Sequence, residues 1–364
     1  MEFGLSEDQR LIEQSLKGYL GDQLPMEEIR RITDTRTGFD DALWQGLTDL
    51  GIPGLLIAEK HGGSALSFLD AAIVAEALGY AAAPTPYVAK AVMAPMALSL
   101  AGSTAQQGEY LPRMAAGTMR VALAAGALSG TTGETGLSLS NDRLTGQASG
   151  LIDGGGATHM LVYLADGRAV LADATGPGIA IQSRPTIDRT RPLADVTFSD
   201  AAVTLLGGEG NTLESARTVL DAGRLILAAD TLGAGQCMVE KAVAYAGERV
   251  QFDRVIASFQ AVKHMCAEMA AALEPCRSLI WYAAHAQDHI VDERRMLASL
   301  AKAHLNDVGR DVSRTATEVH GGMGFTDLMG LHFWFKRCGF NRQVLGSSER
   351  CRNDAAQAQG WLAA

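Results

Sequence analysis

The sequence predicts an α+β protein with a helical N-terminal domain over residues 1–118, a β middle domain over 119–210 and a C-terminal helical bundle over 211–364. Three observations lead to this division. The first part is rich in alanine and carries helix-capping signals. The second part alternates short apolar runs with glycine and polar residues, and the third repeats apolar residues at helical spacing.

In the N-terminal part, capping signals predict where helices begin. Ser6 lies three residues before Gln9, the spacing of a capping box ahead of a first helix. Ser67 is a suitable N-cap for a further helix, which Gly79 is expected to end. Two prolines, Pro84 and Pro86, then break the chain.

The middle part reads as strands because its apolar runs are short and turn residues separate them. Glycine clusters at 154–156 and 207–210 are expected to lie in loops. The expected strands cover residues 121–124, 160–164, 169–172, 179–181 and 196–198.

Three long helices are expected after residue 210. The first begins near a capping signal from Asn211 and Glu214 and runs to about residue 252. The second covers about 256–290, with a kink or break at Pro275. The third starts near residue 292, and His304 is expected to be a structural histidine on its apolar face. The expected face is Leu297, Leu300, His304, Val308, Val312, Ala316 and Val319.

Composition excludes several classes of function. The 364 residues are 47% hydrophobic and 20% charged, which is ordinary for a soluble globular protein. A net charge of −10 without long basic runs makes nucleic acid and anionic membranes poor partners. No apolar run approaches the roughly 18 residues of a membrane-spanning helix, and the acidic start does not resemble a signal peptide. We therefore expect a cytoplasmic protein.

Cysteine and histidine spacing gives little support for a metal or disulfide. The five cysteines are scattered without a C-x-x-C pair, and buried free thiols are the expected state. Only His285 and His289 have the spacing of two ligands on one helix face, and no third ligand accompanies them. We expect no metal site.

The junction between the first two long helices combines groups that suit a dinucleotide. In Arg249–Gln260, Arg249 can bind a phosphate, Phe252 can stack on a flat ring, and Gln260 can donate from its amide. A surface arginine, a core phenylalanine and a capping glutamine explain the residue types equally well. The spacing decides between these interpretations, because it matches a known signature.

A second glycine-rich segment, Ala316–Thr326, follows the third long helix. Gly321 and Gly322 allow the chain to turn with positive φ and to expose backbone N–H groups. Taken alone, this segment is also compatible with an ordinary helix C-cap.

Both segments resemble signatures of the acyl-CoA dehydrogenase family. The first is similar to R-x-Q-F-G-x-P-I-x-x-F-Q, with Asp253 and Val255 in place of the glycine and the proline. The second is similar to A-x-Q-x-x-G-G-x-G-[YF]-T, with Glu318 in place of the glutamine. A carboxylate at that position repels a pyrophosphate unless a cation intervenes. The resemblance implies that the cofactor is FAD and that it is bound by Arg249, Gln251, Phe252, Gln260, Gly321 and Gly322.

The resemblance extends over nearly the whole chain. Four further stretches match family motifs, at residues 50–55, 59–64, 76–79 and 111–117. Residues 188–194 and 331–337 look like a bacterial subgroup that acts on large or branched acyl-CoA thioesters.

The family implies a particular architecture and reaction. We expect a helical N-domain, a β-barrel or sandwich middle domain and a C-terminal four-helix bundle, assembled as a tetramer. The expected reaction is FAD-dependent α,β-desaturation of an acyl-CoA substrate, with an electron-transfer flavoprotein or a similar protein as electron acceptor.

The catalytic base of the family is missing from both of its usual positions. Members carry a glutamate either in a loop near the C-terminus or on the first bundle helix, and here these positions are Gly346 and Gly223. Desaturation requires a carboxylate to remove the α-proton of the thioester. Asp221, Glu349 and Glu318 are the nearest alternatives, and each is expected to be solvated or structural. The catalytic residue is therefore left unassigned.

The segment that surrounds the flavin ring in the family is also eroded. The A-x-T-E-P-x-x-G-S-D loop has its counterpart in Ala122–Ser129, which keeps little of its polar chemistry. The residues that reach into a neighbour's flavin are retained, whereas those around the chain's own flavin are not.

This imbalance leaves three hypotheses. The chain is a catalytically incomplete subunit that completes the FAD site of a sister acyl-CoA dehydrogenase in a heterotetramer with two copies of each chain. Alternatively, it is a self-sufficient homo-oligomer with a non-standard base. The third hypothesis is a flavin-free scaffold.

Overall fold

The computed structural model describes residues 4–35, 37–129 and 135–362. The chain divides into two compact units. One unit contains residues 1–27, 72–83 and 225–364, and the other contains 28–71 and 84–224. Helices α4 (Phe68–Tyr80) and α8 (Leu213–Glu248) contribute residues to both units.

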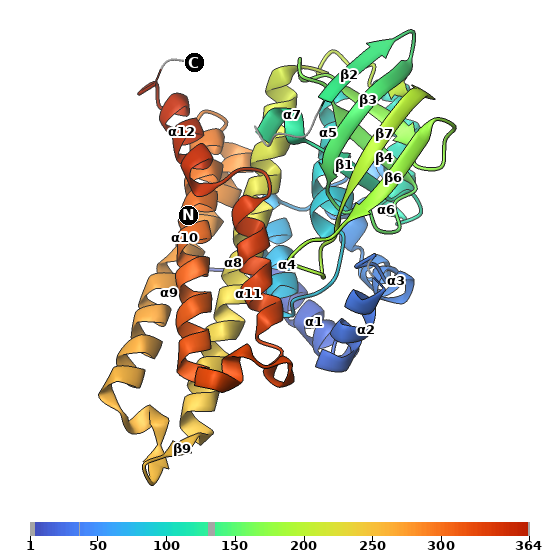
Figure 1. The fold of residues 1–364 in the computed structure, drawn as a ribbon. Coiled ribbons are helices and arrows are strands. Elements are labelled where there is room, and N and C mark those ends of the chain that lie inside the picture. The colour runs from blue at the N-terminus through green and yellow to red at the C-terminus, as the bar shows by residue number, and fades with distance from the viewer. Residues whose placement is uncertain (1–3, 36, 130–134, 363–364) are drawn as a thin grey trace. The chain divides into compact units, whose positions relative to one another are not determined.

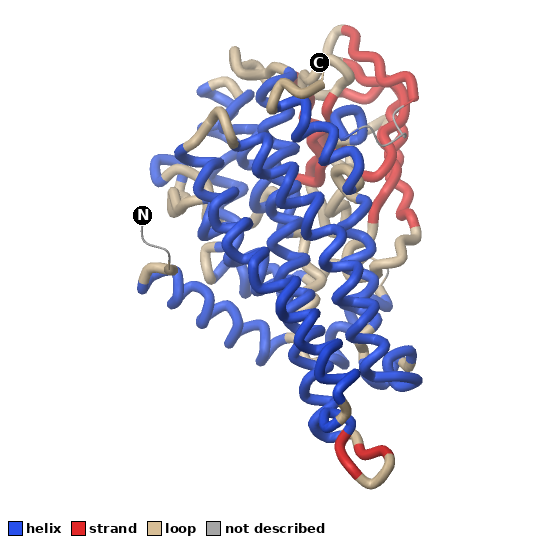
Figure 2. Tube along the Cα trace, turned by 90° about the vertical axis from the view of Figure 1, so that its left-hand side faces the viewer, coloured by secondary structure: helices blue, strands red, loops and turns tan. Residues whose placement is uncertain are grey.

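The first unit is a bundle built on long helices. Figure 1 shows α8, α9, α10 and α11 running beside one another, with a small β-hairpin at one end, and Figure 2 shows the same hairpin beyond the ends of the helices. Besides the end of α4 and most of α8, its elements are α1 (Glu7–Gln23), β9 (Val250–Gln251), β10 (Arg254–Val255), η4 (Ile256–Ser258), α9 (Gln260–His289), α10 (Arg294–His320), η5 (Gly321–Phe325), η6 (Asp327–Met329), α11 (His332–Gln343) and α12 (Ser348–Ala358).

A buried polar network lies at the centre of this bundle. The guanidinium of Arg337 on α11 donates to the carboxylate of Asp230 on α8, with an Nη2–Oδ2 distance of 2.8 Å, and both side chains are buried. Asn341, one turn further along α11, donates to the same carboxylate at 2.7 Å. Because buried charges are tolerated only when they are paired and hydrogen-bonded, this network fixes the position of α11 against α8.

The second unit combines short helices with the β-domain. Its helical elements are α2 (Met26–Asp34, from Glu28 onward), α3 (Asp41–Asp49), η1 (Ile52–Gly54), η2 (Glu59–His61), the start of α4, the π-helix η3 (Val88–Met93), α5 (Ala94–Ala101), α6 (Thr104–Ala115), α7 (Gly126–Ser129) and the start of α8.

Two four-stranded sheets form the β-domain. One has the order β1-β4-β5-β8 and the other β2-β3-β7-β6. Buried apolar side chains from both sheets form a single core cluster, as the expected β-domain requires. The strands are β1 (Val121–Ala124), β2 (Thr135–Ser140), β3 (Arg143–Leu151), β4 (His159–Tyr163), β5 (Ala169–Asp173), β6 (Ile179–Arg184), β7 (Leu193–Ala202) and β8 (Thr204–Leu205).

All five expected strands are present, but the sequence did not reveal β2 and β3. These two strands are made largely of polar and small residues, and β3 contains Gly146 and Gly150. Their apolar residues are too sparse for a run, although Leu144, Ala148 and Leu151 enter the core. Pairing with β7 holds β3 in the sheet where its own composition does not predict a strand.

The expected capping box at Ser6 and Gln9 is confirmed at the start of α1. The expectation that Gly79 ends a helix is wrong, because α4 continues to Tyr80. A Cβ at Gly79 would lie 2.0 Å from the carbonyl oxygen of Asp230, and a Cβ at Gly233 would lie 1.8 Å from that of Glu76. These glycines are therefore required where α4 and α8 approach each other closely, and not for a turn.

The third long helix is correctly placed, but its apolar face is partly misassigned. On α10, Leu300 and His304 are exposed, whereas Lys302 and Asn306 are buried. Lys302 is buried because its ammonium group donates to the carbonyl of Asn341 and to Asn306. The second helix, α9, runs through Pro275 without ending.

Among the described residues, the five cysteines are free, and all except the half-buried Cys266 are buried. No group of histidine, cysteine and carboxylate side chains with the geometry of a metal site occurs within the described ranges. None of the helices in the described part of the chain combines the length and the apolar character needed to cross a membrane.

Candidate functional site

The junction at Arg249–Gln260 forms a β-hairpin at the end of the bundle. Strands β9 and β10 pair antiparallel, with Gln251 opposite Arg254 and Val250 opposite Val255. The hairpin begins directly after α8 and leads through η4 into α9. Two helices of the bundle therefore anchor a projecting two-residue turn at Phe252 and Asp253 (Figure 1).

Phe252 stands in a conformation that phenylalanine rarely adopts. Its φ is +54°, that of Asp253 is +59°, and 87% of the Phe252 side chain is exposed. A left-handed backbone at a bulky residue is unfavourable, and an exposed aromatic ring gains little from burial in its own chain. Strain of this kind is concentrated at ligand-binding positions. A two-residue hairpin turn of this type requires positive φ at both residues, and it leaves the ring of Phe252 exposed.

A second aromatic residue and a cation support this turn. The ring of Phe259 lies 6.0 Å from that of Phe252 in a nearly perpendicular arrangement of 80°. The guanidinium of Arg254 lies 4.0 Å from the centroid of Phe259. The hairpin thus combines stacking surface with positive charge, which is the combination that a dinucleotide requires.

The other predicted cofactor residues of this segment are exposed as well. No ion pair or side-chain hydrogen bond is seen for Arg249 within the described residues, so its guanidinium is available for a phosphate. The amide of Gln251 donates to the neighbouring carbonyl of Val250 at 2.7 Å. The amide nitrogen of Gln260, at the start of α9, lies 2.9 Å from Nε2 of His264.

The glycine segment begins where α10 ends. Gly321 has a φ of +57°, and its N–H caps the helix by donating to the carbonyl of Glu318. Gly321 and Gly322 are exposed, and a Cβ on either would meet no atom within 4 Å. Open space therefore lies above both glycines, as close approach of a phosphate requires. Glu318 is exposed on α10, so its carboxylate is solvated.

The bundle brings the hairpin and the glycine segment to the same end. Tyr245, near the end of α8, stacks on His320, the last residue of α10, with 4.6 Å between the ring centroids and 24° between the ring planes. The carbonyl of Tyr245 accepts a hydrogen bond from the N–H of Arg249. The two predicted half-motifs are therefore joined through one aromatic pair. Sequence reasoning missed this pair, although its members directly flank the two motifs.

Neither of the expected base positions carries a carboxylate. Gly346 lies in the connection between α11 and α12 with a φ of +124°, a backbone conformation that favours glycine. Gly223 is a buried residue of α8. A glutamate at position 346 would be strained, because the backbone there has a positive φ that favours glycine.

The nearest acidic side chains have other roles. Asp221 is buried and paired with Arg224 at 3.5 Å, so it is a structural carboxylate. Glu349 is exposed at the start of α12, where a backbone hydrogen bond lowers the pKa of its carboxyl group. Asp307, which sequence reasoning did not single out, accepts from Ser348 and pairs with Arg352. Burial acts to raise the pKa of its carboxyl group, but the contacts with Arg352 and Ser348 bring it below its ordinary value. A carboxylate held by an arginine is a poor proton acceptor.

The counterpart of the family's flavin-ring loop lies in the second unit. Strand β1 covers residues 121–124, and the short helix α7 follows it. The residues just beyond, 130–134, lie outside the described part of the chain.

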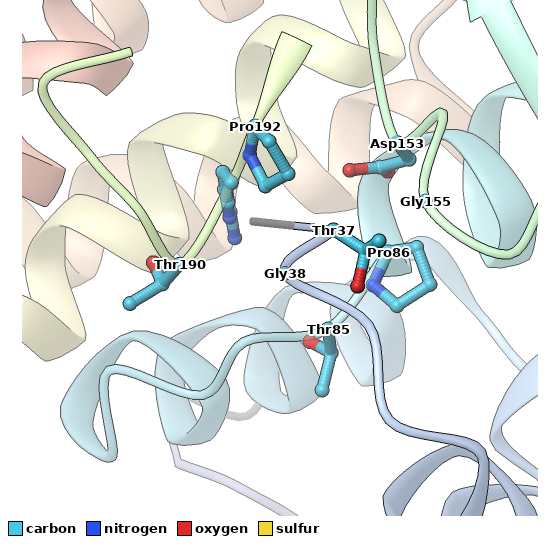
Figure 3. A pocket seen from close by; sticks show the side chains of 9 residues that line it. Thr37, Gly38, Thr85, Pro86, Asp153, Gly155, Thr190 and Pro192 are labelled. Atoms are coloured by element: carbon cyan, nitrogen blue, oxygen red, sulfur yellow. The ribbon is translucent and has the colours of Figure 1, made fainter. Parts of the chain in front are cut away.

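The second unit also contains a small pocket with a cavity volume of about 10 Å³, which is room for about one water molecule. Its size is below the roughly 300–1,000 Å³ of ordinary ligand pockets, so it does not suit a flavin or an acyl-CoA. The pocket drawn in Figure 3 is lined by Thr37, Gly38, Thr85, Pro86, Asp153, Gly155, Thr190, Arg191 and Pro192.

The fold is that of an acyl-CoA dehydrogenase-like protein. Comparison with known families makes this specific. The model of the acyl-CoA dehydrogenase N-terminal domain matches residues 6–118, and the model of the C-terminal domain matches residues 211–360. The chain belongs to the acyl-CoA dehydrogenase family of FAD-dependent oxidoreductases.

Individual relatives agree with this assignment. Acyl-CoA dehydrogenase IpdE2 of Mycolicibacterium smegmatis is 29% identical over 343 residues, which cover 94% of this chain and 96% of the relative. Acyl-CoA dehydrogenase FadE34 of Mycobacterium tuberculosis is 28% identical over 88% of this chain, but that match covers only 43% of FadE34. The latter relative is therefore more than twice as long as the matched part.

Solved structures share the complete fold. The glutaryl-CoA dehydrogenase complex with glutaryl-CoA superposes with a TM-score of 0.89 over 100% of this chain and 98% of the other, at 20% identity. The structure described as the Tcur3481-Tcur3483 steroid ACAD G363A variant has a TM-score of 0.84 over 97% and 98%, at 24% identity. The predicted fold class is therefore confirmed.

Proposed function

We propose that this chain is a subunit without its own catalytic base, and that it completes the FAD site of a sister acyl-CoA dehydrogenase chain. One combination of features carries this proposal. The turn that presents Phe252 beside Arg249 is intact and exposed, whereas both base positions are glycine. A chain with this combination can bind part of a cofactor but cannot start desaturation by itself.

The residues at the end of the bundle fit an FAD that is bound mainly by another chain. Phe252 offers its face to the adenine, and Arg249 offers its guanidinium to the pyrophosphate. Gly321 and Gly322 add backbone N–H groups, and the amide of Gln260 adds a further donor. Arg254, whose guanidinium lies over the ring of Phe259, adds a second positive charge to the hairpin.

The sister chain must then supply the remaining chemistry. When bound, FAD provides the hydride acceptor for α,β-desaturation of a thioester. A carboxylate of the sister chain removes the α-proton, because no carboxylate among the described residues stands free at a base position of this chain. The role of this chain is to orient the cofactor and to exclude water from its dinucleotide half.

Relatives support a shared site. The match covers less than half of FadE34, so one FadE34 chain is long enough to contain two units of this size. The steroid ACAD structure carries two protein names, Tcur3481 and Tcur3483. A further relative is named as the CarC subunit of a caffeyl-CoA reductase-Etf complex. We propose that the assembly is a heterotetramer with two copies of each chain, and that it passes electrons to an electron-transfer flavoprotein.

The substrate class follows from the two stretches that resemble the bulky-substrate subgroup. Residues 188–194 and 331–337 match that subgroup, and the steroid ACAD shares the fold. We propose a large or sterol-derived acyl-CoA thioester as the substrate of the complete enzyme.

The variant Arg249→Ala tests the shared site in the complex of the two chains. Removing a charge-assisted contact to phosphate costs about 1.5–3 kcal/mol, so we expect FAD affinity to fall at least about tenfold. The matched control is Arg143→Ala on β3, an exposed arginine of the other unit, which should leave FAD affinity unchanged. Equal FAD affinity for wild type and Arg249→Ala would contradict the proposed site.

A further inference from the structure

The stack between Tyr245 and His320 joins the end of α8, which leads into the hairpin, to the glycine segment. Tyr245 is connected to the hairpin through the hydrogen bond from the N–H of Arg249 to its carbonyl, at 2.9 Å. His320 is connected to the glycine segment by the chain itself. A change in the stack therefore changes the spacing between Arg249 and Gly321.

The glycine segment is packed tightly against His320. A Cβ at Gly324 would lie 2.6 Å from the carbonyl oxygen of Thr317 and 3.1 Å from Cβ of His320. Gly324 is buried, whereas Gly321 and Gly322 remain exposed. His320 therefore packs against the buried side of the glycine segment. The exposed side of the segment is the one proposed to contact the phosphate.

The hydrogen bond of His320 indicates that its ring is neutral in this position. Its Nδ1 lies 2.8 Å from the carbonyl oxygen of Ala316. A carbonyl only accepts, so Nδ1 carries the proton and Nε2 of the neutral ring is an acceptor. Only 2% of the residue is exposed, and Nε2 has no hydrogen-bond partner within the described part of the chain. A second proton on this ring would therefore be buried without an acceptor.

The surroundings of His320 oppose a positive charge. Burial and the ammonium group of Lys241 on α8 lower its pKa, while the Ala316 carbonyl acts in the opposite direction. The last turns of α8 carry Glu240, Lys241, Tyr245 and Glu248, and Gly321–Phe325 carries no titratable side chain. Lys241 is itself held over the ring of Trp334, 4.8 Å from its centroid.

We infer that His320 is a positioning residue for FAD, which in its neutral form fixes the glycine segment against the hairpin through its stack on Tyr245. This inference rests on the proposed function, because it concerns the same cofactor site. Protonation of the ring at acid pH puts a proton on Nε2, which has no acceptor among the described residues in its buried position, so the ring is displaced and the glycine segment is released. FAD affinity should then fall on acidification before the chain unfolds.

Three variants separate the parts of this inference. His320→Phe keeps an aromatic ring but cannot be protonated. Tyr245→Ala removes the stack at every pH, and Tyr245→Phe keeps it as the matched control. The measurement is the dissociation constant of FAD from the two-chain complex at about pH 7.5 and about pH 5.5.

We expect the FAD affinity of wild type and of Tyr245→Phe to fall at the lower pH, where part of the His320 rings are protonated. His320→Phe should bind FAD equally at both pH values, and Tyr245→Ala should bind about tenfold more weakly at both. The same acid-dependent loss in His320→Phe, or wild-type affinity in Tyr245→Ala, would overturn the inference.

Amide hydrogen exchange of Gly321–Phe325 in this chain alone provides a readout that needs no flavin. A lower protection factor at acid pH in wild type, after correction for the slower intrinsic exchange at that pH, but not in His320→Phe, supports the role of His320 even if the complex retains no FAD at any pH. Complete absence of FAD from the complex contradicts the proposed function only. Exchange that does not differ between the two proteins overturns the positioning role.

Discussion

Phe252 and Phe259 form a nearly perpendicular pair, with 6.0 Å between their ring centroids, at the tip and the base of one hairpin. Phe259 is half-buried at the start of α9, whereas Phe252 is almost fully exposed. The inner ring thus holds the outer ring at a fixed orientation, although the outer ring contributes little to the core of its own chain. This division of roles is expected when the outer ring serves a ligand bound by another chain.

Phe252→Ala should separate binding from stability. The exposed ring stabilises the fold little, so the free energy of unfolding should change by less than about 0.5 kcal/mol. Loss of stacking on adenine costs about 1–3 kcal/mol, so FAD affinity in the two-chain complex should fall by roughly fivefold or more. Urea unfolding and FAD titration measure the two quantities. The control is Ile187→Ala, an exposed apolar residue of the other unit, which should change neither.

Restoring a glutamate at Gly346 should not create an active enzyme. The φ of +124° strains any side chain there by an amount on the order of 1–3 kcal/mol, so Gly346→Glu and Gly346→Ala should both destabilise the chain. Gly339→Ala on α11 is the matched control, because its Cβ meets no atom within 4 Å and should stabilise the helix by up to about 1 kcal/mol. An active, stable Gly346→Glu chain would refute this explanation of the missing base.

Breaking the Asp230–Arg337 pair should destabilise the bundle strongly. Arg337→Met leaves the carboxylate buried without its cation, which costs about 3–5 kcal/mol. The double variant Asp230→Leu/Arg337→Met should lose less than the sum of the single variants, as urea unfolding of all three can measure. Arg184→Met, which breaks the exposed pair with Asp195 on the β-domain, should cost no more than about 1 kcal/mol. Equal losses for Arg337→Met and Arg184→Met would disprove the role of the network.

Lys90 should make stability depend on pH in a defined window. The residue is buried in the π-helix, donates to the carbonyl of Gly155 and lies 4.6 Å from the ring of Phe39. Burial lowers the pKa of its ammonium group to about 7 from 10.5, with Asp153 acting in the opposite direction. Between these values the unfolded chain binds more protons than the folded chain, so the free energy of unfolding rises with pH from about 7 to about 10.5.

The variant Lys90→Met should lack this rise, while exposed Lys263→Met should retain it. The measurement is the difference in urea unfolding free energy between variant and wild type across the window. A difference that stays constant from neutral to alkaline pH would show that Lys90 titrates normally.

Local chemistry explains what the sequence predicted correctly. The capping box at Ser6 needs only residues three apart, and the five predicted strands are apolar runs that any sheet would bury. The hairpin segment could be singled out because its residues are contiguous, and its role in binding FAD stays a prediction. The structure further explains how Asp253 serves where the family has glycine, since aspartate tolerates the positive φ of the turn.

Contacts between distant segments explain what the sequence could not predict. Gly79 is required by the backbone of Asp230, and no local signal distinguishes this role from a helix end. The pairing of Tyr245 with His320 depends on how α8 packs against α10. Lys302 is buried on α10 because acceptors on α11 reach it. Each of these features is a tertiary effect that overrides a local preference.

The central claim is that this chain supplies half of a flavin site and no base. The most direct test is the native mass and the flavin content, from the visible spectrum, of the chain purified alone and together with a sister acyl-CoA dehydrogenase chain. We predict a colourless chain alone, and a yellow, active heterotetramer with one FAD for every two chains. A yellow homo-oligomer of this chain that bleaches with an acyl-CoA would contradict the claim.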